Sequence, residues 1–321
     1  MSGIASTLRD ATARLAGLSE TPRLDAELLM AHALGCSRSD LLLRQAELAV
    51  PDGFAALLAR RIGHEPVAYI TGTQAFWDLN LTVTPDALIP RADSETLIEA
   101  AIEAFSEREG PARMLDLGTG SGALLLAALS AFPAAVGVGI DASAAALAVA
   151  AGNADRLGMS ERATFRHLSW KEEGWAEILS NVSPEPVEGP SLSFPPKKKG
   201  GTSSLDELRG SGRTEFGFDL ILCNPPYVED TAALAPMVAD HEPHSALFAG
   251  PDGLDDYRIL IPAMPALLSP GGVAIFEIGF TQAQAVHYLA TLAGLSTEMR
   301  HDLAGNPRAL RFSLGIGSGN R

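Results

Sequence analysis

Short β-branched segments alternate with helix-like segments from about residue 93 onward, and this alternation constrains the fold more than any other feature. Strand patterns occur at 112–117, 135–140, 163–168, 218–223 and 272–278, and helix patterns at 94–108, 122–131, 143–157, 253–268 and 281–293. Parallel strands need a crossover connection, which is usually a helix. Two further strands near 296–301 and 309–314 have no helix between them, which predicts an antiparallel hairpin at one edge. The pattern therefore predicts an α/β fold with a doubly wound, mostly parallel, seven-stranded sheet.

The first part of the chain has a different pattern, since four short amphipathic segments follow one another with short links. They lie at 2–18, 21–35, 37–48 and 51–63. They predict a small helical bundle, which we assign to residues 1–75. The next stretch, VAYITGTQAFWDLNLTVTPDALIP, is rich in β-branched and aromatic residues and predicts a β-hairpin-like linker over 76–92. The α/β domain would then occupy 93–321.

One segment interrupts the alternation between strands and helices. Residues 179–217 are rich in Pro, Gly and Ser, and they hold Lys197, Lys198 and Lys199, which are three of the four lysines in the chain. Such a segment could be a basic lid or a partner-binding loop. A disordered surface insertion is the interpretation we favour, because closing a long loop costs little free energy.

Charge and cysteine content narrow the functional classes. The 321 residues include 24 Lys and Arg against 39 Asp and Glu, a formal charge of −15, which argues against holding duplex nucleic acid by neutralising its phosphates. Cys36 and Cys223 are far apart and in no metal-ligand spacing, so we expect free thiols, a reducing compartment and no metal. The uncharged stretch 123–140 has the length of a membrane span, but Phe132-Pro133 interrupts it. A buried helix followed by a buried strand is therefore expected, in a cytoplasmic protein that does not bind membranes.

A glycine-rich loop, Gly118-Thr119-Gly120-Ser121-Gly122, follows the strand MLDLG and precedes a helix. Glycines there allow a tight turn and close approach of a ligand, and a helix start presents free N–H groups. The loop also fits the dinucleotide fingerprint, so it does not identify the cofactor alone. Asp116 just before the loop suits an ammonium group better than a pyrophosphate. Asp141, at the end of the next strand, could accept hydrogen bonds from ribose hydroxyls or act as a helix N-cap, and the two roles could coexist.

The motif Asn224-Pro225-Pro226-Tyr227 comes directly after the strand at 218–223, at the edge where doubly wound sheets bind ligands. The prolines remove two N–H donors, which leaves the Asn224 side-chain oxygen and the Pro225 carbonyl as acceptors. Tyr227 adds an aromatic face. This set suits a planar –NH2 group, such as an amide or the amino group of adenine or cytosine. A rigid turn after a strand is the structural alternative, and the glycine loop upstream makes it the weaker one.

The order of these motifs resembles the bacterial peptide chain release factor N(5)-glutamine methyltransferases, the protein-(glutamine-N5) methyltransferase family. The similarity covers nearly the whole chain except 179–217. The segments that carry it are HEPVAYITGTQAFWDLNLTVTPDALIPRADSETLIEA (64–100), LDLGTGSGALLLAAL (115–129), FDLILCNPPYV (218–228), HEPHSALFAGPDGLDDYRIL (241–260) and SPGGVAIFEIG (269–279). The resemblance implies a Rossmann-like, class I methyltransferase that uses S-adenosyl-L-methionine. It also implies methylation of the glutamine in the Gly-Gly-Gln motif of class-1 release factors, which would be its protein partners.

The resemblance also assigns roles to matching positions. It implies that the loop Gly118 to Gly122, which includes Thr119, Gly120 and Ser121, binds the methionine part of the cofactor. Asp141 would bind the ribose, and Trp170 would flank the adenine. Asn224, Pro225, Pro226 and Tyr227 would form the glutamine pocket, with Asn224 also near the cofactor methyl group.

Other positions match the family pattern only in part. Arg91 and Glu95 fit a family segment that suggests an inter-domain brace, and a simple i,i+4 ion pair is the alternative. Ser169 stands where the family usually has an acid for the adenine amino group. His241 and His244 flank Glu242-Pro243 and are expected to line a protein-substrate groove rather than bind a metal.

Three other functional classes remain to be weighed against this one. An amino-methyltransferase acting on DNA or RNA would flip a base into the same pocket, but it would need a basic recognition region that the sequence lacks. A nicotinamide-dependent oxidoreductase would leave the Asn-Pro-Pro-Tyr motif without a purpose. A binding protein that has lost activity through Ser169 and the insertion is the non-enzymatic alternative. We expect an active monomer that forms no stable nucleic-acid complex.

Overall fold

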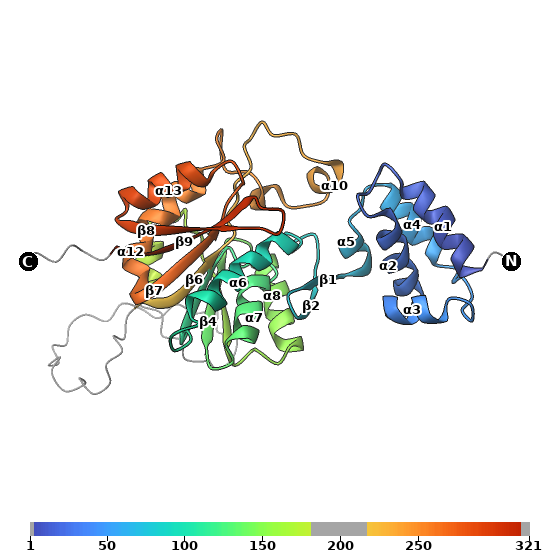
Figure 1. The fold of residues 1–321 in the computed structure, drawn as a ribbon, viewed down its shortest axis with the longest axis horizontal. Helices are drawn as coiled ribbons and strands as arrows, with labels where there is room; N and C mark the ends of the chain where they lie inside the picture. Colours follow the sequence, from blue (N-terminus) through green and yellow to red (C-terminus); the bar gives the residue numbers. More distant parts are fainter. Residues whose placement is uncertain (1–2, 181–216, 316–321) are drawn as a thin grey trace, which may run out of the picture.

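The computed structural model describes residues 3–180 and 217–315 and has two parts joined by a short connection (Figure 1). The N-terminal part is a bundle of α1 (Ile4–Leu15), α2 (Pro22–Leu34), α3 (Arg38–Arg44) and α4 (Phe54–Ile62), which confirms the four predicted helices. Their apolar faces form one core that includes Ile4, Leu29, Leu41 and Phe54. This bundle lies at one end of the molecule, and the sheet lies at the other (Figure 1).

The connection between the two parts differs from the sequence prediction. It consists of a short helix, α5 (Val67–Thr71), and an antiparallel hairpin of β1 (Thr73–Phe76) and β2 (Leu79–Thr82). The hairpin therefore begins before residue 76 and ends well before 92, and the first β-branched residues of the stretch are helical. Pro66 at the helix N-cap favours this start, and Gly72 ends the helix with a φ of 73°. Local turn signals here outweighed the strand preference of the side chains.

A seven-stranded sheet forms the second part, in the order β5-β4-β3-β6-β7-β9-β8. The strands are β3 (Arg113–Leu117), β4 (Val136–Asp141), β5 (Ala163–His167), β6 (Phe218–Cys223), β7 (Leu268–Glu277), β8 (Leu295–His301) and β9 (Pro307–Leu314). The first five in this order are parallel, and β9 pairs antiparallel with both β7 and β8. The predicted doubly wound sheet with an antiparallel hairpin at one edge is confirmed.

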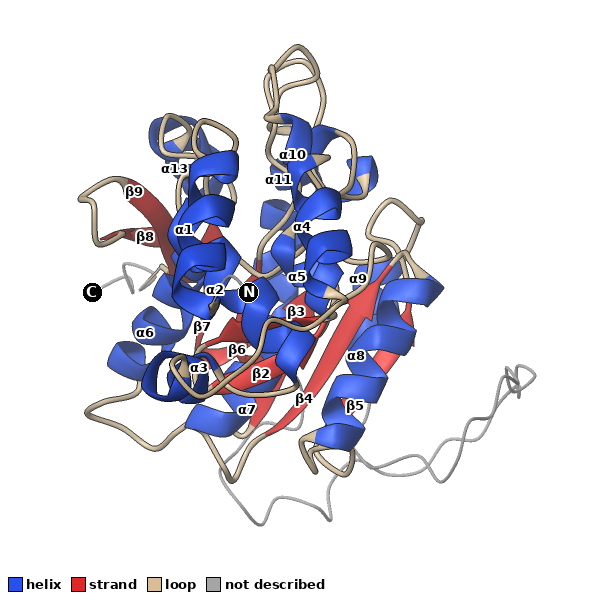
Figure 2. Cartoon of the chain, turned by 90° about the vertical axis from the view of Figure 1, so that its right-hand side faces the viewer, coloured by secondary structure: helices blue, strands red, loops and turns tan. Residues whose placement is uncertain are grey.

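Helices cover both faces of the sheet (Figure 2). One apolar core joins α6 (Glu95–Ala104), α7 (Ala123–Ala131) and α8 (Ala144–Arg156) to one set of strand residues. A second core joins α9 (Trp175–Ser180), α11 (Asp255–Leu260), α12 (Met264–Leu267) and α13 (Ala283–Leu292) to the other set. Neighbouring strand residues alternate between the two cores, as Leu220 and Ile221 do. This alternation explains why the strands read as continuous apolar runs.

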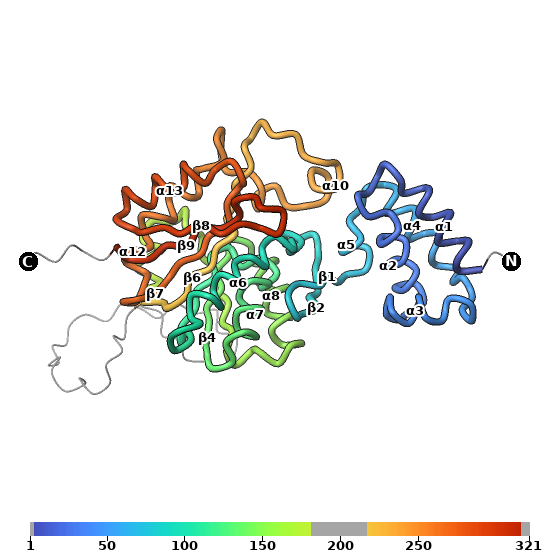
Figure 3. The backbone as a smooth tube through the Cα atoms, in the orientation of Figure 1, coloured from blue at the N-terminus to red at the C-terminus, as the bar shows by residue number. Residues whose placement is uncertain are grey.

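The path of the chain through this domain is followed most easily in the tube of Figure 3. The uncharged stretch 123–140 is helix α7 followed by strand β4, as predicted. The single helix predicted at 253–268 is instead α11, a 3-10 turn (Ile261–Ala263) and α12, because Pro262 and Pro265 interrupt it. A four-residue helix, α10 (Pro236–Ala239), and 3-10 turns at Ala92–Ser94 and His244–Ala246 complete the elements of the described residues.

The predicted insertion at 179–217 falls almost entirely outside the described residues. The described chain stops at Ser180, at the end of α9, and resumes at Gly217. Phe218 then begins β6 and pairs with Leu268 at the start of β7. The chain therefore re-enters the sheet at the amino ends of its parallel strands, which is the edge opposite to the candidate site.

Candidate active site

Strand β3 ends in a glycine-rich turn that leads directly into α7. Gly118, Gly120 and Gly122 have φ values of 75°, 54° and 84°, which L side chains rarely adopt. The N–H groups of Gly118 and Thr119 donate to the Ile140 carbonyl at 3.0 and 2.9 Å. The turn is thus held against the end of β4, and it has the left-handed conformations for which glycine is required.

Asp116 lies on β3 just below this turn and is completely buried. The Thr119 hydroxyl donates to its Oδ2 at 2.6 Å, whereas its Oδ1 has no hydrogen-bond partner among the described residues. Burial raises the pKa of Asp116 to about 7, although the Thr119 hydrogen bond lowers it. A buried carboxylate oxygen without a donor is rare in folded proteins, and this one lies just behind the glycine turn.

Asp141 at the end of β4 holds the glycine turn from the other side. Its Oδ2 accepts from the Gly120 N–H at 2.9 Å, and its Oδ1 accepts from the Ser143 N–H at 2.8 Å. The N-cap of α8 is Ser143, whose hydroxyl accepts from the Ala146 N–H at 3.1 Å. The proposed N-cap role for Asp141 is therefore wrong, because a residue two positions later takes it.

Trp170 packs its indole against the glycine turn. A Cβ atom added to Gly118 would lie only 3.0 Å from the ring, so this glycine is also required for space. The indole Nε1 donates to Asp256 Oδ1 at 2.6 Å, and Lys171 Nζ lies 3.2 Å from the same oxygen. Asp256 is completely buried, so these contacts fix the orientation of the ring.

The Asn-Pro-Pro-Tyr motif begins where β6 ends and is tied to a buried carboxylate on β7. Asn224 Nδ2 donates to Ser94 Oγ at 3.2 Å, and the Ser94 hydroxyl donates to Glu277 Oε2 at 2.5 Å. The Tyr227 hydroxyl donates to Glu277 Oε1 at 3.1 Å. The first and last residues of the motif are thus connected through two side chains, those of Ser94 and Glu277.

The pKa values of Glu277 and Tyr227, the two ionisable groups in this network, are both raised, which favours their neutral forms. Burial raises the pKa of Glu277 above its ordinary value, although the hydrogen bonds from Ser94 and Tyr227 lower it. Burial also raises the pKa of Tyr227 well above its usual range, and the negative charge of Glu277 adds to this effect. Tyr227 is therefore a neutral phenol and a hydrogen-bond donor near neutral pH.

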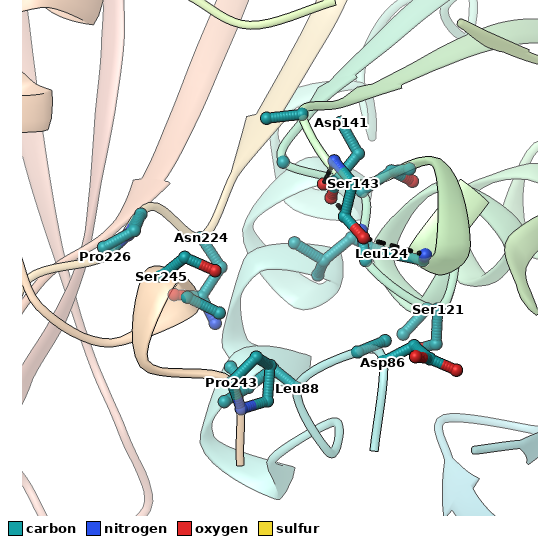
Figure 4. A pocket seen from close by; sticks show the side chains of 18 of the residues that line it. Asp86, Leu88, Ser121, Leu124, Asp141, Ser143, Asn224, Pro226, Pro243 and Ser245 are labelled. Carbon is teal, nitrogen blue, oxygen red and sulfur yellow. Dashed lines mark hydrogen bonds between the residues drawn. The ribbon is translucent and has the colours of Figure 1, made fainter. Parts of the chain in front are cut away.

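These features meet in one cavity of about 440 Å³ (Figure 4). Eight of the residues assigned from the sequence line it, namely Gly118, Thr119, Gly120, Ser121, Asp141, Trp170, Asn224 and Pro226. Four others do not, namely Asp116, Gly122, Pro225 and Tyr227. Gly122 caps α7 beneath the turn, and the Tyr227 hydroxyl points to Glu277. The structure therefore brings the glycine loop and Asn224 to a common space.

Two further segments complete the wall of this cavity. Linker residues contribute Asp86, Ala87, Leu88 and Pro90, and the loop after β6 contributes Pro243, Ser245 and Ala246. Leu88, Pro243 and Ser245 are drawn around Asn224 in Figure 4. The cavity thus has a polar end at the glycine loop and a largely apolar end beside Asn224.

Arg91 and Glu95 do not pair with each other. Arg91 forms an ion pair with Glu242, a side chain with no exposed surface in the loop after β6, and the Ile89 N–H donates to the same carboxylate at 3.4 Å. Glu95 Oε1 accepts from the Trp77 N–H at 2.8 Å. The alternative of a simple i,i+4 ion pair is therefore excluded, because each side chain has a partner distant in sequence. Arg91 instead connects the linker to the loop that closes the cavity.

Known proteins match both parts of the chain. The family model for the PrmC N-terminal domain matches residues 6–72, and a methyltransferase domain model matches residues 109–178. The release factor glutamine methyltransferase of Rhodospirillum rubrum is 40% identical over 303 residues, covering 92% of this chain and 80% of that protein. That of Cereibacter sphaeroides is 39% identical over 319 residues, covering 97% and 98%. The chain belongs to this family.

The matches to release factor glutamine methyltransferases align with the elements of the structure. The N-terminal model ends at Gly72, where α5 ends, so it covers the bundle and the short helix. The methyltransferase model runs from before β3 to within α9, and it includes the glycine turn, Asp141 and Trp170. The predicted methyltransferase fold is thus confirmed.

Several residues of this methyltransferase site were not assigned from the sequence, namely Ser94, Glu242, Asp256 and Glu277. Glu277 carried the clearest signal, because an acid at the carboxyl end of a predicted buried strand lies at the ligand-binding edge of such a sheet. Asp256 and Glu242 lie in motif segments that carried the family resemblance, but nothing in their spacing shows what they contact.

The described residues contain neither a cluster that could bind a metal ion nor a helix that could span a membrane. Across residues 3–180 and 217–315, no three His, Cys, Asp or Glu side chains are grouped so that they could hold a metal ion. Within the same ranges, every helix is too short or too polar to cross a bilayer.

Proposed function

We propose that this protein transfers a methyl group from S-adenosyl-L-methionine to the side-chain amide nitrogen of the glutamine in the Gly-Gly-Gln motif of class-1 release factors. The observation that carries the proposal is the shared cavity, in which the glycine turn and Asp141 at one end face the same space as Asn224 at the other. Membership in the release factor glutamine methyltransferase family supports the choice of substrate.

The residues at the polar end of the cavity fit the proposed cofactor. Asp116 does not itself line the cavity, but it lies directly beneath the glycine turn that does, and its oxygen without a donor would attract an ammonium group bound at that turn. The glycine turn leaves room for close approach, and Asp141 lines the cavity where ribose hydroxyls could reach its carboxylate. Trp170 provides a flat surface for the adenine, and the Ser169 hydroxyl lines the same region. When bound, this cofactor supplies a methyl group on a positively charged sulfur.

Asn224 and its neighbours would bind and orient the amide. An amide nitrogen is a poor nucleophile, because its lone pair is delocalised into the carbonyl group. The Asn224 side-chain oxygen lines the cavity and can accept one of its hydrogens, which would direct the lone pair toward the methyl group. The same acceptor would stabilise the positive charge that develops on nitrogen. Because the methylated amide is a strong acid while it carries that charge, it loses its proton without a dedicated base.

The parts outside the cavity would recognise the protein substrate. We assign release-factor recognition to the bundle at 1–75, in which seven arginines balance eight acidic residues and no lysine occurs. Leu43 on α3 exposes 84% of its surface, which suits contact with a protein more than with phosphates. The linker at 76–92 supplies part of the cavity wall, so docking on the bundle would be transmitted to the site through a short path.

Mass spectrometry of a purified class-1 release factor tests this function. After incubation with the enzyme and S-adenosyl-L-methionine, the Gly-Gly-Gln peptide should gain one methyl group on its glutamine. A release factor in which that glutamine is replaced should gain none. An unmodified wild-type factor, or faster transfer to DNA or RNA oligonucleotides than to the protein, would contradict the proposal.

A further inference from the structure

The carboxylate of Glu277 lies behind Asn224 and does not line the cavity. Its side chain is 1% exposed and accepts hydrogen bonds from the Ser94 and Tyr227 hydroxyls. Its backbone is held independently, since its carbonyl accepts from the Tyr257 hydroxyl at 2.7 Å and the residue pairs with Ala309 on β9. A buried, well-anchored acid so close to the reacting amide needs an explanation that folding alone does not supply.

Hydrogen-bond direction supplies that explanation. Both carboxylate oxygens of Glu277 accept a hydrogen bond, one from Tyr227 and one from Ser94, so the single hydroxyl hydrogen of Ser94 is committed to Glu277. Ser94 can then offer only its oxygen to Asn224, and Asn224 must present its NH2 group to Ser94. The Asn224 Oδ1 atom has no hydrogen-bond donor among the described residues, so it is left for the substrate.

We propose that Glu277 is a positioning residue that fixes the side-chain amide of Asn224 with its oxygen, and not its NH2 group, available to the substrate glutamine. The inference rests on the proposed function, because it matters only if the substrate presents N–H groups to Asn224. Glu277 acts through Ser94 and touches no reacting atom. Asn224 donates to Ser94, and Ser94 in turn donates to the Glu277 carboxylate.

Replacing the carboxylate with an amide would reverse this order. Glu277→Gln offers one oxygen and one NH2 group to Ser94 and Tyr227. The buried Tyr227 hydroxyl needs an acceptor, so it takes the oxygen, and the NH2 group faces Ser94. Ser94 then accepts from residue 277 and donates its hydrogen to Asn224 Oδ1. Asn224 is turned, and its NH2 group meets the N–H groups of the substrate.

A paired substitution separates this effect from simple loss of structure. Glu277→Gln should lower kcat for release-factor methylation by about 100-fold, with little change in KM, because orientation of the acceptor is lost. Ser94→Ala alone should lower kcat by about tenfold. In the double variant the misdirecting hydroxyl is gone, so Asn224 can turn back, and kcat should recover to about tenfold above that of Glu277→Gln.

A matched control exists at the opposite edge of the same strands. Ser269 on β7 donates its hydroxyl to Asp219 Oδ1 on β6 at 2.7 Å. Asp219→Asn, alone and combined with Ser269→Ala, removes an equivalent serine–carboxylate pair far from the cavity. These variants should keep wild-type kcat, and the double variant should show no recovery relative to Asp219→Asn.

The outcomes distinguish this inference from the proposed function. If the wild-type enzyme fails to methylate the release factor, the proposed function is wrong. If the wild type is active and Glu277→Gln stays within about threefold of it, or the double variant is less active than Glu277→Gln, the positioning role is wrong. Circular dichroism and calorimetric cofactor binding show whether Glu277→Gln folds. If it does not, Ser94→Ala is the deciding variant. A kcat of Ser94→Ala within about twofold of wild type overturns the inference.

Discussion

Neutralising Asp116 should weaken cofactor binding without lowering the stability of the free protein. The buried carboxylate has a pKa raised from 3.8 to about 7 by desolvation, and its Oδ1 lacks a hydrogen-bond partner among the described residues. In the free protein an ionised Asp116 is therefore unfavourable. A bound ammonium group would reverse that preference and favour the ionised form.

The magnitude follows from the pKa. Because folding raises the pKa of Asp116, its contribution to folding stability is fully present below about pH 4. That contribution is on the order of 4 kcal/mol for three pKa units, and it is lost as the pH rises to about 7. Cofactor binding depends on pH in the opposite direction and weakens as the pH falls. The ionised fraction falls from about one half at pH 7 to about 3% at pH 5.5, so the cofactor Kd should rise on the order of tenfold.

Isothermal titration calorimetry of S-adenosyl-L-methionine at pH 7 and pH 5.5 measures this directly. Asp116→Asn should bind at least about tenfold more weakly at pH 7 and should lose the pH dependence, while its thermal unfolding temperature does not fall. Asp78→Asn is the control, because Asp78 also accepts from a hydroxyl, that of Ser130 at 2.7 Å, but lies at the opposite end of α7 from the glycine turn. A wild-type Kd that is equal at the two pH values, or a pH dependence that persists in Asp116→Asn, would refute the reasoning.

Three other predictions concern catalysis, the glycine turn and the linker. Asn224→Ala should abolish transfer while cofactor Kd changes by less than about threefold, and activity within about tenfold of wild type in a methylation assay would rule out its role. Gly122→Ala should destabilise the protein by about 2–3 kcal/mol, because φ is 84° and the new Cβ would lie 3.1–3.2 Å from packed side chains. Gly120→Ala, with open space around it, should cost only about 1 kcal/mol, and equal losses in denaturant unfolding would contradict this difference. Arg91→Ala leaves the buried Glu242 carboxylate without its cation, which should cost about 2–3 kcal/mol and should be largely relieved by adding Glu242→Gln in a double-mutant cycle.

Most of the fold could be predicted because each strand carries its own apolar pattern and its own turn signals. The predicted strands at 112–117, 135–140 and 218–223 match β3, β4 and β6 within one residue. The errors arise where a single residue overrides a regional pattern. Prolines divide the helix expected at 253–268, and Pro66 with Gly72 turns a β-branched segment into α5. Side-chain preferences average over a segment, whereas proline and glycine act at one position.

The candidate site could be predicted in part for a related reason. The glycine turn, Asp141 and Asn224 all follow predicted strand ends, so the topology of a parallel sheet brings them to one edge. The connection between Ser94 and Glu277 spans 183 positions of sequence and depends on side-chain orientation. No spacing rule relates two residues so far apart. The partner of Arg91 could not be found from the sequence for the same reason, since Glu242 lies 151 positions away.

The position of β9 has a consequence for synthesis of the protein on the ribosome. Residues 307–314 form the last strand of the described chain, yet they pair between β7 and β8 and contact the backbone of Glu277 through Ala309. Until these residues have emerged, β7 has an open edge beside the Asn-Pro-Pro-Tyr loop, and an open edge is a template for pairing with other chains. A nascent chain stalled before residue 307 would therefore hold every residue that lines the cavity while the edge of β7 stays unpaired. Translation of β9 covers that edge, so stalling before β9 would favour pairing of β7 with other chains.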